Sequence, residues 1–169
     1  MTHGRKPRQP RTRVQNPVRL AAWQAALLDH SQVETIMAPL RQAFKALREG
    51  VANEQQWAHL VSAMNIADSV ALTSPVRGTR GHIEPAQRAL DGIMRRAMAT
   101  GEWRPTALYY EELDLVRDGL QIYHHQLRHL TRGEYQRAED HAAADVRRAA
   151  GAVVINTTPA SEQLALAGV

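Results

Sequence analysis

The chain of 169 residues contains no cysteine. This absence excludes a disulfide framework, a thiol nucleophile and a thiolate metal site. The sequence also lacks any apolar run close to the roughly 20 residues that cross a bilayer. The short apolar stretch 20–28 is interrupted by Gln24 and followed by Asp29, which is not the pattern of a secretory signal. We therefore expect a cytoplasmic protein without a membrane partner, stabilised by packing.

Catalytic motifs are missing as well. The sequence has no Gly-x-Ser-x-Gly, P-loop, dinucleotide fingerprint or His-Glu-x-x-His. Glu111 and Glu112 are adjacent acids, but neighbours on a helix point about 100° apart and do not converge. We expect a protein that is not an enzyme, with no catalytic residue, cofactor or metal.

Lysine is scarce, and arginine supplies 19 of the 21 positive side chains. Residues 1–19 contain six cations and no acid: Arg5, Lys6, Arg8, Arg11, Arg13 and Arg19. The other 150 residues therefore hold 15 basic against 17 acidic side chains, a net charge of −2. The high pI thus belongs to the N-terminus and not to the rest of the chain.

Residues 1–15 contain two prolines and no apolar period, so we predict a disordered basic arm. Such an arm neutralises phosphates and releases counterions, which gives salt-dependent affinity for nucleic acid. We predict that its cations bind nucleic acid; an acidic protein surface and a merely solvating tail are the alternatives.

A second basic group lies on the predicted loop 73–82 and the helix after it. Its members are Arg77, Arg80, Arg88, Arg95 and Arg96. Arg88 and Arg95 are seven residues apart and share a helix face. The first four are further predicted nucleic-acid contacts, and an ordinary solvated face is the alternative. No helix-turn-helix signature is clear.

The rest of the sequence predicts one helical domain over residues 16–150, an all-α bundle of five to six helices, followed by a loose tail over 151–169. Asn16 before Pro17 predicts a helix start. Capping boxes are predicted at 31–34, 53–56 and 131–134, and glycine stops at Gly50 and Gly101. Pro39 predicts a kink or break. The apolar residues 153–155 could dock on the bundle.

The clearest helix is predicted near residues 109–130. Apolar residues recur there at alternating spacings of four and three: Tyr109, Leu113, Val116, Leu120, Tyr123, Leu127 and Leu130. This is an apolar seam of about three heptads. It suits either the core of a monomer or a homodimer interface.

Some polar and aromatic residues could form a site but have a simpler structural interpretation. His125 and His129 are four residues apart, the spacing of two ligands for one ion. With His124, however, they lie opposite the seam, where solvent is expected. Asn65 and Asp68 are expected to form structural hydrogen bonds, with Asn65 bonded to a neighbouring helix. Trp57 and Trp103 are expected in the core or at its rim.

Several short motifs carry a resemblance to known proteins. They are the Arg/Pro-rich start before Asn16-Pro17, Gly50-x-Ala52-Asn53, Leu60-x-x-x-x-Asn65-Ile66, Arg95-Arg96, Thr100-Gly101, Glu112 and Thr131-x-x-Glu134-x-x-x-Ala138. In these residues the chain resembles a group of small helical proteins from phages, plasmids and integrative elements of β-proteobacteria. The resemblance implies a mobile-element accessory protein and supplies no site residues.

Two functions follow as expectations. The first is a non-enzymatic, nucleic-acid-associated regulator or accessory protein of a mobile genetic element. The second is a stoichiometric inhibitor of a host protein complex, such as a counter-defence protein resembling anti-CRISPR proteins.

Overall fold

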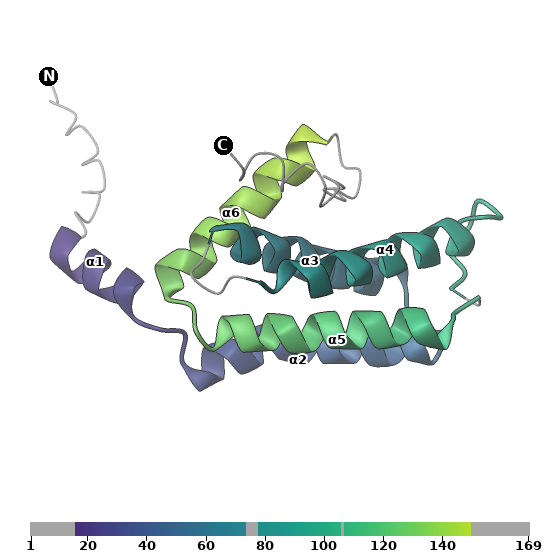
Figure 1. The fold of residues 1–169 in the computed structure, drawn as a ribbon, viewed down its shortest axis with the longest axis horizontal. Coiled ribbons are helices and arrows are strands. Elements are labelled where there is room, and N and C mark those ends of the chain that lie inside the picture. Colours follow the sequence, from purple (N-terminus) through teal and green to yellow (C-terminus); the bar gives the residue numbers. More distant parts are fainter. Residues whose placement is uncertain (1–15, 74–77, 106, 150–169) are drawn as a thin grey trace, which may run out of the picture.

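The computed structural model describes residues 16–73, 78–105 and 107–149, and within these ranges the fold is all-α (Figure 1). The helices in them are α1 (Pro17–Ala25), α2 (His30–Arg48), α3 (Glu54–Thr73), α4 (Arg80–Ala97), α5 (Tyr110–Leu127) and α6 (Arg132–Arg148). The predicted bundle of five to six helices is confirmed. The predicted arm 1–15, the tail 151–169 and the docking segment 153–155 lie outside the described residues.

Three helix starts lie where the sequence predicts them. Their side-chain caps are Asn16 for α1, Asn53 with Gln56 for α3, and Thr131 with Glu134 for α6. Gly50 and Gly101 adopt φ values of 70° and 81°, which favour glycine after the ends of α2 and α4. Local backbone chemistry thus determines these boundaries.

The predicted capping box at residues 31–34 is wrong by two residues. Asp29 caps α2 instead: its carboxylate accepts from the Gln32 amide at 2.9 Å, and the Gln32 side chain accepts from the Asp29 amide at 3.1 Å. The Ser31 hydroxyl donates to the same carboxylate at 2.6 Å. The helix start at Asp29 is favoured over the predicted start at Ser31 because the Asp29 carboxylate accepts hydrogen bonds from both an amide and a hydroxyl.

The break predicted at Pro39 does not occur, since α2 continues through it to Arg48. Proline leaves the carbonyl four residues earlier, that of Thr35, without its helical donor. Both residues are exposed, so water can reach this carbonyl. The fourth helix begins at Arg80, within the segment 73–82 that is predicted to be a loop.

Helices α2, α3, α4 and α5 form a bundle in which each helix packs against two or three others, and α6 crosses the outside of α3 (Figure 1). The apolar residues of α4 that recur at helical spacing are buried: Ile83, Leu90, Ile93 and Ala97. In α2, Leu40 and Leu47 are buried, whereas Ile36 and Phe44 are half-buried. The core therefore lies between these helices, as the apolar spacing predicts.

The seam of α5 faces this core. Six of its seven positions are buried, namely Leu113, Val116, Leu120, Tyr123, Leu127 and Leu130. Leu130 follows the helix and packs with Val70 and Ala138 in a second, smaller cluster. Tyr109 precedes the helix and is exposed. Because the seam is filled within one chain, a homodimer would need another surface.

Close contact between helices depends on Gly119 in α5. A Cβ atom built there would lie 2.7 Å from the Ala86 Cβ and 2.8 Å from the Met64 Sδ. Both distances are far below van der Waals contact. The absent side chain therefore lets α5 pack directly on α4 and α3.

The two tryptophans lie at the rim of the bundle, as predicted. The rings of Trp57 and Trp103 are 5.7 Å apart and tilted. Each indole N–H donates to a backbone carbonyl, Trp57 to Leu90 at 3.0 Å and Trp103 to Ala52 at 2.7 Å. Both rings have structural partners, as half-buried tryptophans usually do.

Candidate interface at the N-terminal helix

Helix α1 projects from the bundle and leads directly into the basic arm (Figure 1). None of its residues is buried. Val18, Trp23 and Leu27 near this helix are 74%, 52% and 57% exposed. Large apolar side chains so exposed on one short element are typical of a binding surface.

The C-terminal end of α1 is fixed to the bundle by backbone hydrogen bonds. The amide of Leu28 donates to Leu130 at 3.0 Å, and the amide of Arg132 donates to Ala26 at 2.9 Å. These bonds flank the isolated β-bridge between Leu27 and Thr131. The attachment lies at one end of α1, so its other end, which carries the arm, points away from the bundle.

Arg132 completes the attachment through its side chain. Its guanidinium lies over the Trp23 ring, 5.5 Å from the centroid, and its Nη2 is 3.2 Å from the Asp29 carboxylate. The Ser31 hydroxyl, the Gln32 amide and Arg132 together lower the pKa of Asp29 below its ordinary value. One arginine thus links α1, the α2 cap and the start of α6.

Gly133 allows α1 to approach α6 closely. A Cβ atom on this residue would lie 3.2 Å from both the Cβ and the carbonyl oxygen of Gln24. The same position would be 3.4 Å from Nη1 of Arg137. Among the described residues, Arg137 and Arg19 form no ion pair, and Arg137 shares a surface cavity with Glu134 and Asp140. Sequence reasoning missed Arg137, since its position beside α1 depends on a tertiary contact.

The predicted arm contacts Arg5, Lys6, Arg8, Arg11 and Arg13 lie outside the described residues, as does Arg77. They stay predictions.

The other predicted contacts of the second basic group have acidic partners. Arg80 is 3.1 Å from the Asp68 carboxylate and 3.2 Å from Glu84, and its side chain is only 19% exposed. Arg88 is 4.0 Å from Glu84, and Arg95 pairs with Asp91. These contacts favour the solvated-face interpretation for Arg88 and Arg95 and a structural ion pair for Arg80.

Arg96, the remaining member, bridges two helices. It pairs with Glu112 of α5, and its guanidinium lies 4.6 Å from the centre of the Tyr109 ring. Glu111 is exposed while Glu112 points to this arginine. The two glutamates therefore do not act on one point, as their adjacency predicts.

The three histidines do not gather metal ligands. The rings of His125 and His129 are 4.5 Å apart, and Nδ1 of His129 lies 2.8 Å from the His125 carbonyl, to which it donates. Across residues 16–73, 78–105 and 107–149, no group of three His, Asp or Glu side chains could hold an ion. His124 instead lines a separate surface cavity beside His30 and Arg128.

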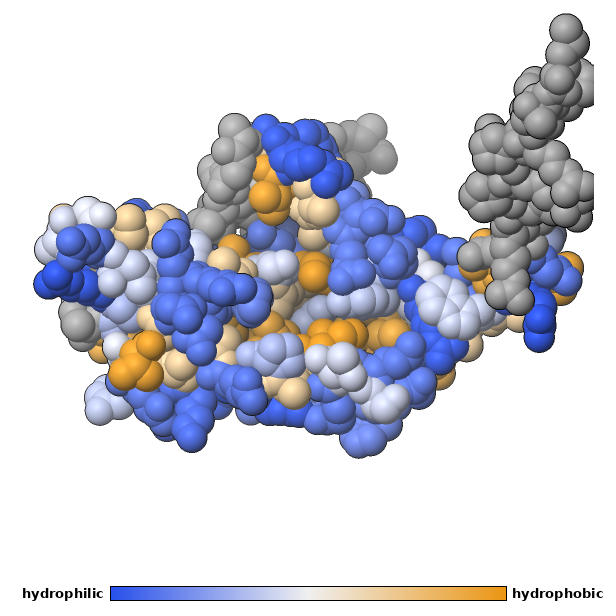
Figure 2. All heavy atoms as spheres, turned by 180° about the vertical axis from the view of Figure 1, so that it is seen from behind, coloured by the Kyte–Doolittle hydropathy of each residue, from blue (hydrophilic) through white to orange (hydrophobic). Residues whose placement is uncertain are grey.

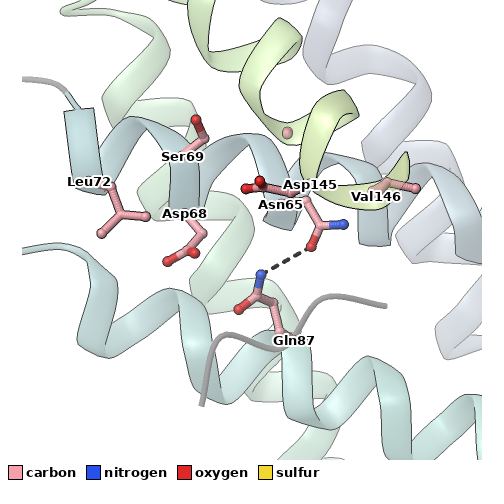
Figure 3. Close-up of a pocket in the computed structure, with 8 residues that line it drawn as sticks. Asn65, Asp68, Ser69, Leu72, Gln87, Asp145 and Val146 are labelled. Atoms are coloured by element: carbon pink, nitrogen blue, oxygen red, sulfur yellow. Dashed lines mark hydrogen bonds between the residues drawn. The ribbon is translucent and has the colours of Figure 1, made fainter. Parts of the chain in front are cut away.

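A buried polar cluster connects α3 with α4 (Figure 3). Gln87 donates to the Asn65 carbonyl oxygen at 3.1 Å, which confirms the predicted bond from Asn65 to a neighbouring helix. Ser69 Oγ and Gln87 Oε1 have no hydrogen-bond partner among the described residues. The cavity beside them has a volume of about 10 Å³, roughly enough for one water molecule. The cluster is therefore a structural feature and not a substrate site.

Tyr123 and Tyr135 form a second polar contact between helices. The Tyr135 hydroxyl donates to Glu139 at 2.8 Å. Burial, with smaller contributions from Tyr135 and Glu139, raises the pKa of Tyr123 well above its ordinary value, and burial with Glu139 also raises the pKa of Tyr135. Both phenols stay protonated at neutral pH, which does not suit them to act as catalytic bases.

No protein family, curated protein or solved structure matches the chain. Among the described residues, no helix has the length and apolar character needed to span a membrane.

Proposed function

We propose that this protein is a non-enzymatic, nucleic-acid-associated accessory protein of a mobile genetic element, acting in the cytoplasm. Its basic arm binds the phosphate backbone, and the helical body carries the arm. The proposal depends on one observation, the segregation of charge. Six cations and no acid lie in residues 1–19, whereas Arg80, Arg88, Arg95 and Arg96 of the body each have an acidic partner.

The geometry of α1 supports this proposal. A flexible cationic segment binds phosphates best when the acids of its own body do not compete for it. Helix α1 leads away from the bundle (Figure 1), and it contains no acidic residue while carrying Arg19. The arm therefore begins on a cationic, projecting element.

The test is fluorescence anisotropy with labelled duplex and single-stranded DNA over a range of salt concentrations. One variant changes the five cations of residues 5–13 to glutamine. Its matched control changes five ion-paired arginines of the body to glutamine, which alters net charge equally: Arg41, Arg88, Arg95, Arg104 and Arg117.

We expect the natural chain to bind duplex DNA with a steep salt dependence. Five lost phosphate contacts should reduce the log–log slope by about 4 to 5 units in the arm variant. The body variant should keep most of the slope. Binding that is the same in both variants, or no binding at low salt, would contradict the proposal.

The exposed apolar residues of α1 favour a second candidate, stoichiometric inhibition of a host protein complex. An amphipathic helix presenting Leu20 and Trp23 can insert into an apolar groove of a partner. In that case a complex of defined stoichiometry should be lost with Leu20→Ser and Trp23→Ser but survive neutralisation of the arm. Loss with the arm variant alone would instead favour an electrostatic partner.

A further inference from the structure

An apolar groove runs along the outer face of α3, beneath α6. Figure 2 shows apolar side chains gathered in a hollow at the middle of this face, between polar side chains. The groove has a volume of about 610 Å³, and its apolar lining includes Trp57, Val61, Ile66, Ala142 and Val146. This volume lies within the range of about 300–1,000 Å³ that is typical of ligand pockets.

The groove continues toward α2. A second cavity of about 210 Å³ shares Ser62 and Ile66 with it and extends to Ile36, Pro39 and Leu40. The two cavities therefore form one trough along the α3 residues 57–66. Nine helical steps make this trough about 14 Å long.

The charged residues that line the groove do not indicate a charged ligand. Of its two charged residues, Glu139 accepts a hydrogen bond from Tyr135. Arg147 lies at the end of α6 and is exposed. The polar cavity with Asn65 adjoins one side (Figure 3). An uncharged, apolar occupant fits this lining best.

We propose that residues 152–156 of this same chain occupy the groove. They read Ala-Val-Val-Ile-Asn, and no charged residue lies between 149 and 161. Four extended steps span about 13 Å, close to the length of the trough. The basic segment 1–15 offers no comparable apolar run, and residues 74–77 are too few.

The position where α6 ends supports this occupant. Val146 and Arg147 line the groove and belong to the last turn of α6, which ends at Arg148. Val153 follows five residues later and can lie up to about 17 Å away. A tethered segment also has an effective concentration of about millimolar, which favours it over a second copy of the chain at lower concentration.

The first test compares two variants that add the same charge to this segment. Val154→Asp places a carboxylate within the apolar run, and Thr158→Asp places one just beyond it. Val154→Asp should lower the urea midpoint by about 0.5 M and increase the fluorescence of an added apolar dye, because the groove is uncovered. Thr158→Asp should change neither. Equal behaviour of the two variants would overturn the proposal.

The second test uses the absence of cysteine in the chain. The pair Ser62→Cys and Val154→Cys should form an intramolecular disulfide under mild oxidation, since docking brings the two Cα atoms within about 7 Å. The control pair joins Ser62→Cys with Ala160→Cys. A freely moving segment would crosslink both pairs at similar rates, and crosslinked dimers would place a second copy in the groove; either result overturns the proposal.

Discussion

Helix α5 has all five of its seam residues buried, whereas α1, half as long, buries no side chain at all. The two helices are held in place by different kinds of interaction. Packing of apolar side chains around Gly119 holds α5. A pair of backbone hydrogen bonds and the side chain of Arg132 hold α1.

The comparison indicates where the molecule can change without loss of its fold. Burial of apolar area is the main favourable term in folding, so the bundle should be stable without α1. Conversely, the large apolar side chains of α1 are exposed and can contact the surface of another molecule. The part of the protein that contributes least to stability is thus the part that we propose to support binding.

The largest expected change in stability comes from comparing the same substitution, leucine to alanine, in α5 and beside α1. Leu127→Ala removes a fully buried side chain of the seam and should lower the free energy of unfolding by about 2–5 kcal/mol. Leu27→Ala, at a position 57% exposed beside α1, should change it by less than about 0.5 kcal/mol. Urea unfolding followed by circular dichroism measures both. Similar losses would mean that α1 belongs to the cooperative core.

A smaller effect is expected from two glycines within the bundle. Gly119→Ala brings a methyl group against Ala86 and Met64 and should cost about 1–3 kcal/mol through overpacking. At Gly92 in α4 the nearest atoms belong to the long side chains of Glu112 and Arg96. Gly92→Ala should therefore be neutral or stabilise by up to about 1 kcal/mol, because alanine favours helix. A stabilising Gly119→Ala would show that α5 is free to shift.

The sequence predicted most of the boundaries that depend on local chemistry, although the cap of α2 is Asp29 and not Ser31. The spacing of the α5 seam, the caps at Asn16 and Thr131 and the stop at Gly50 follow from residues close together in the chain. The sequence predicted that Asn65 bonds to a neighbouring helix, because a polar side chain in a buried helix needs a hydrogen-bond partner. It did not identify Gln87 as that partner.

Features that depend on contacts between distant segments could not be predicted. Nothing near Pro39 in the chain shows that its side of α2 faces water. Arg80 looked like a phosphate contact because its partner Asp68 lies on a different helix. The same limit applies to the α1 attachment, in which Asp29 and Arg132 are 103 residues apart. Basic composition therefore predicts the arm, but it does not separate ion-paired from exposed cations in the body.

The smallest expected effect concerns the junction between the two regions and depends on pH. Asp29→Asn keeps an oxygen that can cap α2 but removes the charge that faces Arg132. The folded pKa of Asp29 lies below its ordinary value of 3.8. Its charge therefore stabilises the fold above about pH 3.8, and this contribution is lost as the pH falls through the folded pKa.

The natural chain should accordingly have a higher urea midpoint than Asp29→Asn at pH 7, and the difference should shrink as the pH falls below 3.8 and through the folded pKa of Asp29. Asp118→Asn, which removes a charge from the exposed face of α5, serves as the control. Hydrogen exchange of the α1 amides adds a local measurement. If the carboxylate holds Arg132 over Trp23, those amides should exchange faster in Asp29→Asn at pH 7 while the amides of α5 stay protected. Faster exchange in both helices would mean that α1 and the bundle unfold together.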